Sequence, residues 1–145
     1  MRRSRSWGIL AAVILVAVAT VFAGCNLLQY QFCINNFTSY DLKEVNVANQ
    51  GALSWGPNDL TSVLVSGQSE DIKGFAPGTY MVRGVFDIVD EFLFCGEAVN
   101  NELIVVNEGI EITTTNVCID YYQGLSWNRR LPACSTIYGD VRFEI

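Results

Sequence analysis

The chain has 145 residues, with 9 basic and 15 acidic side chains and a formal net charge of −6. This length suits one domain with its own core better than two. The acidic balance disfavours nucleic acid as a partner, and because the sequence has no histidine, Ser-His-Asp and Cys-His hydrolases are excluded.

The first 24 residues have the order of an export signal. Three arginines lie among the first five residues, residues 7–23 are uncharged, and Gly24 precedes Cys25. A basic start, an apolar run and a small residue before the cleavage point are typical of a signal peptide. The run Phe-Ala-Gly-Cys at 22–25 resembles the lipobox of bacterial lipoproteins, in which the cysteine is lipidated and the chain is cut before it.

This resemblance implies three segments: a signal-peptide helix over 1–24, a lipidated N-terminus with a short tether over 25–29, and one domain over 30–145. It implies anchoring in a bacterial cell membrane or outer membrane, with the domain on the extracytoplasmic side. An uncleaved membrane anchor, an ordinary secretory signal and a twin-arginine signal are alternatives. The apolar run of 17 residues is shorter than the roughly 20 that cross a bilayer, and every alternative exports the domain.

The rest of the chain consists of short strand-like runs separated by turn residues. Tyr80, Val82, Gly84, Phe86 and Ile88 alternate with more polar residues, which is the period of a half-buried strand. Such runs predict an all-β fold, a single, disulfide-braced, mostly antiparallel β-sandwich. The expected strands are 30–35, 42–48, 62–65, 70–75, 79–89, 91–99, 103–107, 110–119 and 141–145.

Three short patterns lie between residues 35 and 87: Asn-Asn-Phe-Thr-Ser-Tyr at 35–40, Trp-Gly-Pro-Asn-Asp at 55–59 and Gly-Thr-Tyr-Met-Val-Arg at 78–83. Together they resemble a pattern of small exported bacterial β-domains of uncharacterised function. This resemblance implies an architecture and no activity. We expect the Asn-rich segment to end one strand, and the segment at 55–59 to form a rigid turn whose indole covers the end of a core.

Five cysteines are an odd number for an exported protein, but lipidation of Cys25 leaves an even set. The other four, Cys33, Cys95, Cys118 and Cys134, suit two disulfides in an oxidising compartment. Three connectivities are possible, and we favour Cys118 with Cys134 and Cys33 with Cys95. Cys33 lies on the polar phase of its strand, which a disulfide between two sheets would not prefer. Because no pair has C-x-x-C spacing, neither a metal site nor a cofactor is predicted.

The densest acidic group is formed by Asp87, Asp90 and Glu91. Glycoside hydrolysis needs two carboxylates held apart in a cleft, and calcium needs about 6 to 8 oxygens. Since Asp90 and Glu91 stand where one predicted strand would turn into the next, we expect a solvated hairpin tip. The sequence therefore predicts a protein that is not an enzyme.

The segment 119–133 is the candidate ligand-binding loop, because it gathers aromatic and Arg side chains in an acidic protein. Its candidate residues are Tyr121, Tyr122, Trp127, Arg129 and Arg130. Such side chains are enriched in binding hot spots, and aromatic rings also stack on sugars. Alternatively, Tyr122 and Trp127 cap the end of the sandwich and the arginines pair with nearby acids.

The leading functional hypothesis is a cell-envelope lipoprotein that presents a non-enzymatic interaction or structural domain at a membrane surface. The alternative is a carbohydrate-binding module that uses the aromatic and Arg loop 119–133. A third, weaker hypothesis is a small hydrolase with a carboxylate pair. The predicted partners are the membrane, through the lipid anchor, and a protein or a glycan.

Overall fold

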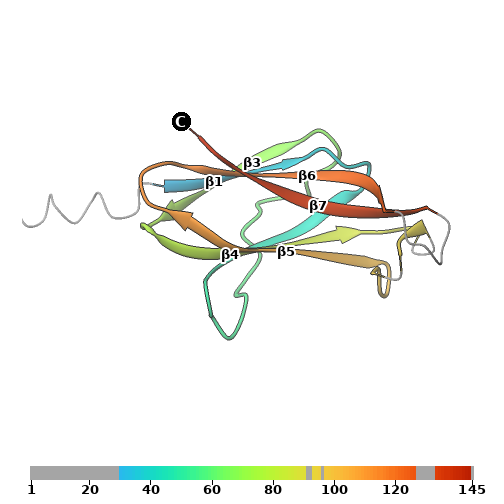
Figure 1. Ribbon diagram of the computed structural model, residues 1–145, viewed down its shortest axis with the longest axis horizontal. Helices are drawn as coiled ribbons and strands as arrows, with labels where there is room; N and C mark the ends of the chain where they lie inside the picture. The colour runs from blue at the N-terminus through green and yellow to red at the C-terminus, as the bar shows by residue number, and fades with distance from the viewer. Residues whose placement is uncertain (1–29, 91–92, 96, 127–132, 145) are drawn as a thin grey trace, which may run out of the picture.

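The computed structural model describes residues 30–90, 93–95, 97–126 and 133–144, so the predicted signal peptide and tether lie outside the described residues. Within these ranges the chain forms seven strands, shown in Figure 1. They are β1 (Tyr30–Asn36), β2 (Asp41–Asn49), β3 (Ser69–Phe75), β4 (Gly78–Asp87), β5 (Glu102–Ile112), β6 (Val117–Ser126) and β7 (Cys134–Phe143). In this part of the chain no helix is long and apolar enough to cross a membrane.

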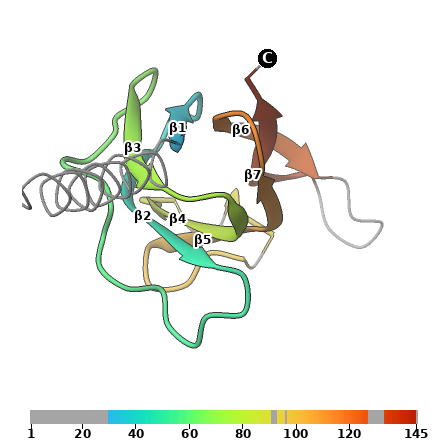
Figure 2. The same cartoon turned by 90° about the vertical axis from the view of Figure 1, so that its left-hand side faces the viewer.

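The strands form two sheets, which lie one above the other in Figure 1 and are seen from the end in Figure 2. One sheet has the strand order β3-β1-β6-β7 and the other the order β2-β4-β5. Strands β1 and β6 are parallel, whereas the remaining described strand pairs are antiparallel. The prediction of an all-β, mostly antiparallel, two-sheet fold is confirmed.

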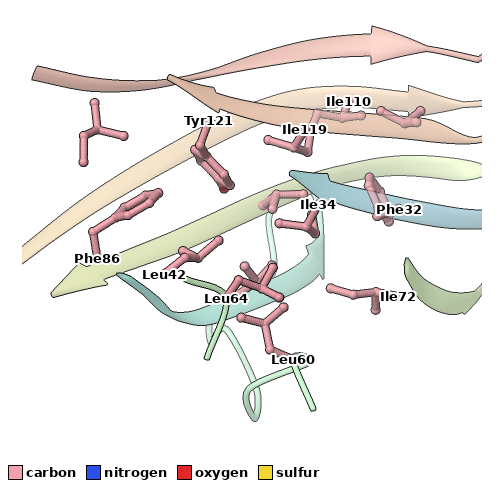
Figure 3. Packing of buried hydrophobic residues seen from close by; sticks show 14 of the residues in the cluster. Phe32, Ile34, Leu42, Leu60, Leu64, Ile72, Phe86, Ile110, Ile119 and Tyr121 are labelled. Carbon is pink, nitrogen blue, oxygen red and sulfur yellow. The ribbon is translucent and has the colours of Figure 1, made fainter. Parts of the chain in front are cut away.

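The core lies between the two sheets (Figure 3). Alternate residues of each inner strand enter it, and Phe32, Phe86 and Ile119 are completely buried because side chains on a strand point to opposite faces in turn. The ring of Phe32 meets the ring of Tyr80 edge-on, with 5.6 Å between centroids. All five members of the predicted alternation from Tyr80 to Ile88 are buried, but Met81 and Val85 of the opposite phase are buried too, so burial does not alternate strictly along β4.

Several predicted strands are wrong. Residues 62–65 make only the isolated bridge of Leu64 with Leu42, and the described residues of 91–99 likewise form isolated bridges. Leu60 and Leu64 are buried from an irregular segment, which shows that an apolar run can enter a core without being a strand. The predicted strand 110–119 contains the end of β5, a turn and the start of β6.

The break expected between the predicted strands 103–107 and 110–119 is instead a bulge within β5. The pairing of β4 with β5 shifts register between Tyr80 and Val82, and Gly109 has a φ of 68°. Glycine tolerates this left-handed conformation, so one extra residue enters the strand without ending it.

All four downstream cysteines form disulfides, as predicted, but the favoured pairing is wrong. The bonds are Cys33 with Cys118 and Cys95 with Cys134. Cys33 and Cys118 are register partners in the parallel pair β1–β6, with 4.4 Å between their Cα atoms. This position explains the polar phase of Cys33, because the disulfide lies within one sheet on its outer face. Cys118 is near the start of β6 and Cys134 is opposite its end, so these two cannot meet.

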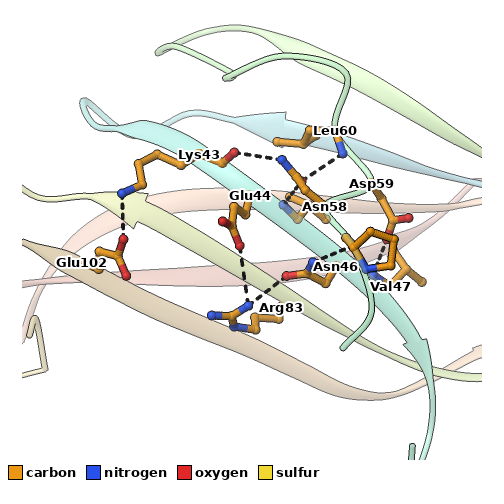
Figure 4. Close-up of polar contacts among 11 residues, drawn as sticks. Lys43, Glu44, Asn46, Val47, Asn58, Asp59, Leu60, Arg83 and Glu102 are labelled. Atoms are coloured by element: carbon orange, nitrogen blue, oxygen red, sulfur yellow. Dashed lines mark hydrogen bonds and ion pairs between the residues drawn. The ribbon is translucent and has the colours of Figure 1, made fainter. Parts of the chain in front are cut away.

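The segment 57–60 covers the free edge of β2 (Figure 4). The Oδ1 atom of Asn58 accepts the N–H groups of Val45 at 3.0 Å and Leu60 at 3.1 Å. The Oδ2 atom of Asp59 accepts the N–H of Val47 at 2.7 Å. These side chains take the place of a neighbouring strand, which protects an otherwise open edge.

The buried Asn36 organises the connection between β1 and β2. Its amide nitrogen donates to the carbonyls of Tyr40 and Leu64, both at 2.8 Å. Its Oδ1 accepts the N–H of Thr38 at 3.1 Å and the hydroxyl of Thr38 at 2.8 Å. The Asn-rich turn expected at this place is therefore held by an asparagine whose hydrogen-bonding capacity is used inside the fold.

Candidate functional site

The two predicted ligand-binding residues that the structure describes do not lie in a loop. Tyr121 and Tyr122 belong to strand β6, whereas Trp127, Arg129 and Arg130 lie outside the described residues. Tyr121 is completely buried between the sheets, which corrects its assignment to an exposed loop. Tyr122 is the next residue of the strand, so it points to the outer face.

Three aromatic rings form a row at the outer face of the four-stranded sheet, called here the aromatic row: Phe37, Tyr122 and Tyr138. The rings of Phe37 and Tyr122 are stacked, with centroids 5.2 Å apart and planes 18° apart. The rings of Tyr122 and Tyr138 are 5.9 Å apart and tilted by 35°. Phe37 is 52% exposed and Tyr138 is 50% exposed, so the row presents aromatic surface to solvent.

Backbone pairing sets the position of each ring. The N–H of Phe37, one residue beyond β1, donates to the carbonyl of Tyr121 at 2.9 Å. Tyr122 and Tyr138 are register partners across β6 and β7, so their side chains leave the sheet on the same face. A Cβ atom at Gly124 would lie 3.3 Å from the ring of Tyr138. The glycine therefore leaves room for this ring to lie close to the backbone of β6.

Charged and polar groups lie beside the aromatic row. Asp120 precedes Tyr122 by two residues on the same face, and it accepts hydrogen bonds from Asn35 at 2.6 Å and from Arg142 at 3.1 Å. The hydrogen bond with Asp120 raises the pKa of Arg142. Asp140, the register partner of Asp120, is exposed. The outer face therefore offers aromatic rings next to an exposed carboxylate and a guanidinium.

The structure describes two members of the acidic group considered for catalysis. Asp87 and Asp90 are exposed where β4 leads into its antiparallel neighbour β5, as expected for a solvated hairpin connection. Asp87 ends β4 and Asp90 lies in the connection of residues 88–101 to β5, while Glu91 lies outside the described residues. A general acid needs a sheltered environment that shifts its pKa, so this pair carries no proposal for catalysis.

Among the described residues, one group places three potential metal-ligating atoms within 4.8 Å of one another: Cys33, Cys118 and Glu144. The two cysteines are joined as a disulfide. Since the thiolate is the form of cysteine that binds metals, this group in its oxidised form is a poor metal site.

A groove of about 500 Å³ lies beside the end of β2. Trp55 of the predicted rigid turn lines it together with Phe75 and Tyr80. The indole is half-buried in this groove. None of the lining residues is charged; they are Val47, Ala48, Asn49, Ala52, Ser54, Trp55, Gly56, Gly74, Phe75, Ala76 and Tyr80.

Phe37 and Tyr138 were not among the candidate residues predicted from the sequence. Phe37 stands in a segment rich in turn formers, and Tyr138 lies in a part of the chain with no predicted strand before residue 141. A signal for the second was present, because residues 136–143 alternate between polar and apolar side chains. That alternation predicts a strand with Tyr138 on its outer face.

No protein family model matches this chain, and neither a curated protein nor a solved structure shows significant similarity to it. The functional assignment therefore depends on the residues and geometry described above.

Proposed function

We propose that this chain is an exported, lipid-anchored protein whose β-domain binds a partner at the surface of a bacterial membrane and catalyses no reaction. The lipobox-like run that ends at Cys25 supports the anchor. The two disulfides support an oxidising compartment outside the cytoplasm. The aromatic row supports binding as the activity.

The observation that carries the binding activity is the half-exposed state of Phe37 and Tyr138 on either side of Tyr122. Rings that pack on one another lose little further conformational entropy when a partner covers them. Aromatic side chains with an adjacent Arg are also the types that dominate binding energy at interfaces. A partner can therefore gain affinity from this surface without rearranging the sheet.

A glycan is the second candidate partner, and the composition of the surface favours it. Aromatic rings present apolar faces on which a sugar ring can stack. The exposed carboxylate of Asp140 can accept hydrogen bonds from sugar hydroxyls. The guanidinium of Arg142, which is partly exposed beside Asp120, can donate hydrogen bonds to them. The residues proposed for this role lie on β6, on β7 and just beyond β1, rather than on the loop 119–133 alone.

Intact-mass measurement of the mature protein from a bacterial host tests the anchor. The expected mass lacks residues 1–24 and includes acyl chains on Cys25. An unacylated product, or one that retains residues 1–24, would contradict the proposal.

Ligand binding tests the aromatic row. The purified protein is applied to a glycan array, and in parallel a photo-crosslinker at position 136, beside the row, captures envelope proteins in cells. We expect Tyr138→Ala to weaken binding at least tenfold. Phe143→Ala is the matched control, because Phe143 is also 50% exposed on β7 but lies outside the row. Equal loss in both variants, or no ligand in either assay, argues against the aromatic row.

A further inference from the structure

Residues 50–58 form an uncharged loop that follows β2 and ends within the segment 57–60, which covers the edge of that strand. It contains no Asp, Glu, Lys or Arg. Leu53 within it is completely exposed, and Trp55 is half-buried in the groove beside it. Figure 2 shows this part of the chain extending away from both sheets, at the bottom of the view. Leu53 therefore gives the loop an apolar tip in contact with solvent.

Hydrogen bonds hold the 50–58 loop at both ends. At its start, the N–H of Gln50 donates to the carbonyl of Thr79 at 2.9 Å, and the Gln50 side chain accepts the N–H of Gly109 at 2.9 Å. Near its end, the carbonyl of Pro57 accepts a hydrogen bond from Asn46 at 2.8 Å. The fold therefore fixes where Leu53 projects.

The groove beside the loop lies at the end of the domain where the chain enters β1. Phe75 lines the groove and is also the register partner of Tyr30, the first residue of β1. Four residues lie between Cys25 and Tyr30, and the five extended steps from Cα to Cα span at most about 18 Å. A lipid on Cys25 would therefore hold this end of the domain close to the bilayer.

We propose that the 50–58 loop inserts Leu53 and Trp55 into the interface of the bilayer to which Cys25 is anchored. The proposal rests on the lipid anchor proposed above. A bilayer accepts a single protruding apolar tip, whereas a stable protein interface needs about 1,200 Å² or more of buried surface. Tryptophan favours the interfacial region of membranes, and the loop has no charge that would oppose its transfer there.

The test uses the full chain, expressed and processed in bacteria and reconstituted into phosphatidylcholine vesicles. A Trp127→Phe background leaves Trp55 as the single tryptophan after residue 24. Vesicles with brominated acyl chains should quench Trp55 fluorescence at least twofold. Leu53→Asp should abolish most of this quenching. Val89→Asp is the control, because Val89 is also a largely exposed apolar residue, at 81% against 105% for Leu53. Val89 follows the opposite end of β4, and its replacement should leave the quenching unchanged.

Two further measurements test the anchor independently of the loop: the acyl mass on Cys25 and flotation of the protein with the vesicles. An acylated protein that floats but shows no quenching of Trp55 overturns the membrane contact and leaves the anchor intact. Equal quenching in the wild type and Leu53→Asp also overturns it. Loss of quenching together with a Leu53-dependent dimer would assign the loop to a second copy of the chain. A protein that carries no acyl mass and does not float with the vesicles would contradict the lipid anchor and, with it, the proposed membrane contact.

Discussion

Tyr121 and Tyr122 are neighbours in the chain but lie in opposite environments. The ring of Tyr121 packs edge-on against Phe86, with centroids 5.1 Å apart, inside the core. Its hydroxyl is buried and has no hydrogen-bond partner among the described residues. A Cβ at Gly84 would lie 2.7 Å from this hydroxyl, so a glycine on β4 provides the space for the tyrosine. Tyr121 therefore fills space in the core but leaves one buried oxygen without a hydrogen-bond partner among the described residues.

The first prediction concerns this hydroxyl. Tyr121→Phe should raise the free energy of unfolding by about 1 kcal/mol, because a buried unpaired polar group costs about 1 to 3 kcal/mol. Tyr80→Phe is the matched variant, since the Tyr80 hydroxyl donates to the carbonyl of Ala76 at 2.7 Å, and it should lower stability by about 1 kcal/mol. Urea unfolding measures both. Destabilisation of similar size in the two variants would show that the Tyr121 hydroxyl is paired in solution.

The second prediction follows from the ionisation of the same group. Burial raises the pKa of Tyr121 above its ordinary value, so the folded state keeps the proton at pH values where the unfolded chain releases it. Stability should therefore fall as the pH rises above about 10, the pKa of an unperturbed tyrosine. The free energy of unfolding of Tyr121→Phe should decline less steeply between pH 9 and pH 11. Identical slopes for the two proteins would contradict this.

At the scale of elements, the open edge of β2 is closed by side chains. Asn58 makes three hydrogen bonds to the backbone: it accepts from Val45 and Leu60 and donates to the carbonyl of Lys43 at 3.2 Å. The third prediction is that Asn58→Ala lowers the free energy of unfolding by about 1 to 3 kcal/mol, because buried N–H groups lose their acceptor.

Asn49→Ala serves as the control for this variant. Asn49 is exposed at the end of the same strand, and its replacement should change stability by less than about 0.5 kcal/mol. Thermal unfolding followed by circular dichroism measures both variants. An Asn58→Ala protein as stable as the control would mean that water satisfies the edge of β2 equally well.

The fourth prediction concerns the ion pair between β2 and β5. Lys43 and Glu102 meet at 2.7 Å on the outer face, with β4 between their strands. The hydrogen bond with Lys43 lowers the pKa of Glu102. The stability that this pair supplies is therefore present above the ordinary glutamate pKa of about 4.3 and is lost as the pH falls through the lowered value.

Glu102→Gln should consequently lose less stability than the wild type between pH 6 and pH 3, as judged by the unfolding midpoint. Glu108→Gln removes an exposed carboxylate from the same strand and should follow the wild type. A Glu102→Gln profile that parallels the wild type would show that the pair is open in solution.

Local pattern predicted some elements well and others not at all. Strands β1 and β4 could be predicted from their alternating apolar residues, because one face of each strand packs against the core. Most of β6 was missed because the segment 119–133 was interpreted as a loop closed by a Cys118–Cys134 disulfide. Residues 134–140 of β7 were missed although the alternation from residue 136 onward indicates a strand. The aromatic row could not be predicted from the sequence. It joins Phe37 to residues about 85 and 100 positions away, and periodicity within one strand carries no information about which strands are neighbours.

At the scale of the whole molecule, the least local feature of the fold is the parallel pair β1–β6. A short hairpin can join two antiparallel strands, whereas two parallel neighbours require a long crossover connection. Here the crossover passes through both sheets, since β2, β4 and β5 of the opposite sheet and β3 of the same sheet intervene along the chain. The disulfide of Cys33 with Cys118 joins this pair directly and closes a sequence separation of 85 residues.

The fifth prediction is that this disulfide contributes a large part of the stability of the domain. By the chain-entropy relation, a separation of 85 residues corresponds to about 4.6 kcal/mol, and the 39 residues between Cys95 and Cys134 to about 3.9 kcal/mol. Small domains are stable by only about 5 to 15 kcal/mol, so the double variant Cys33→Ala/Cys118→Ala should unfold at a much lower urea concentration. Cys95→Ala/Cys134→Ala, which frees a peripheral connection, should lose somewhat less. Peptide mapping without reduction should recover Cys33 linked to Cys118, and recovery of Cys118 linked to Cys134 would contradict both the pairing and the parallel neighbourhood of β1 and β6.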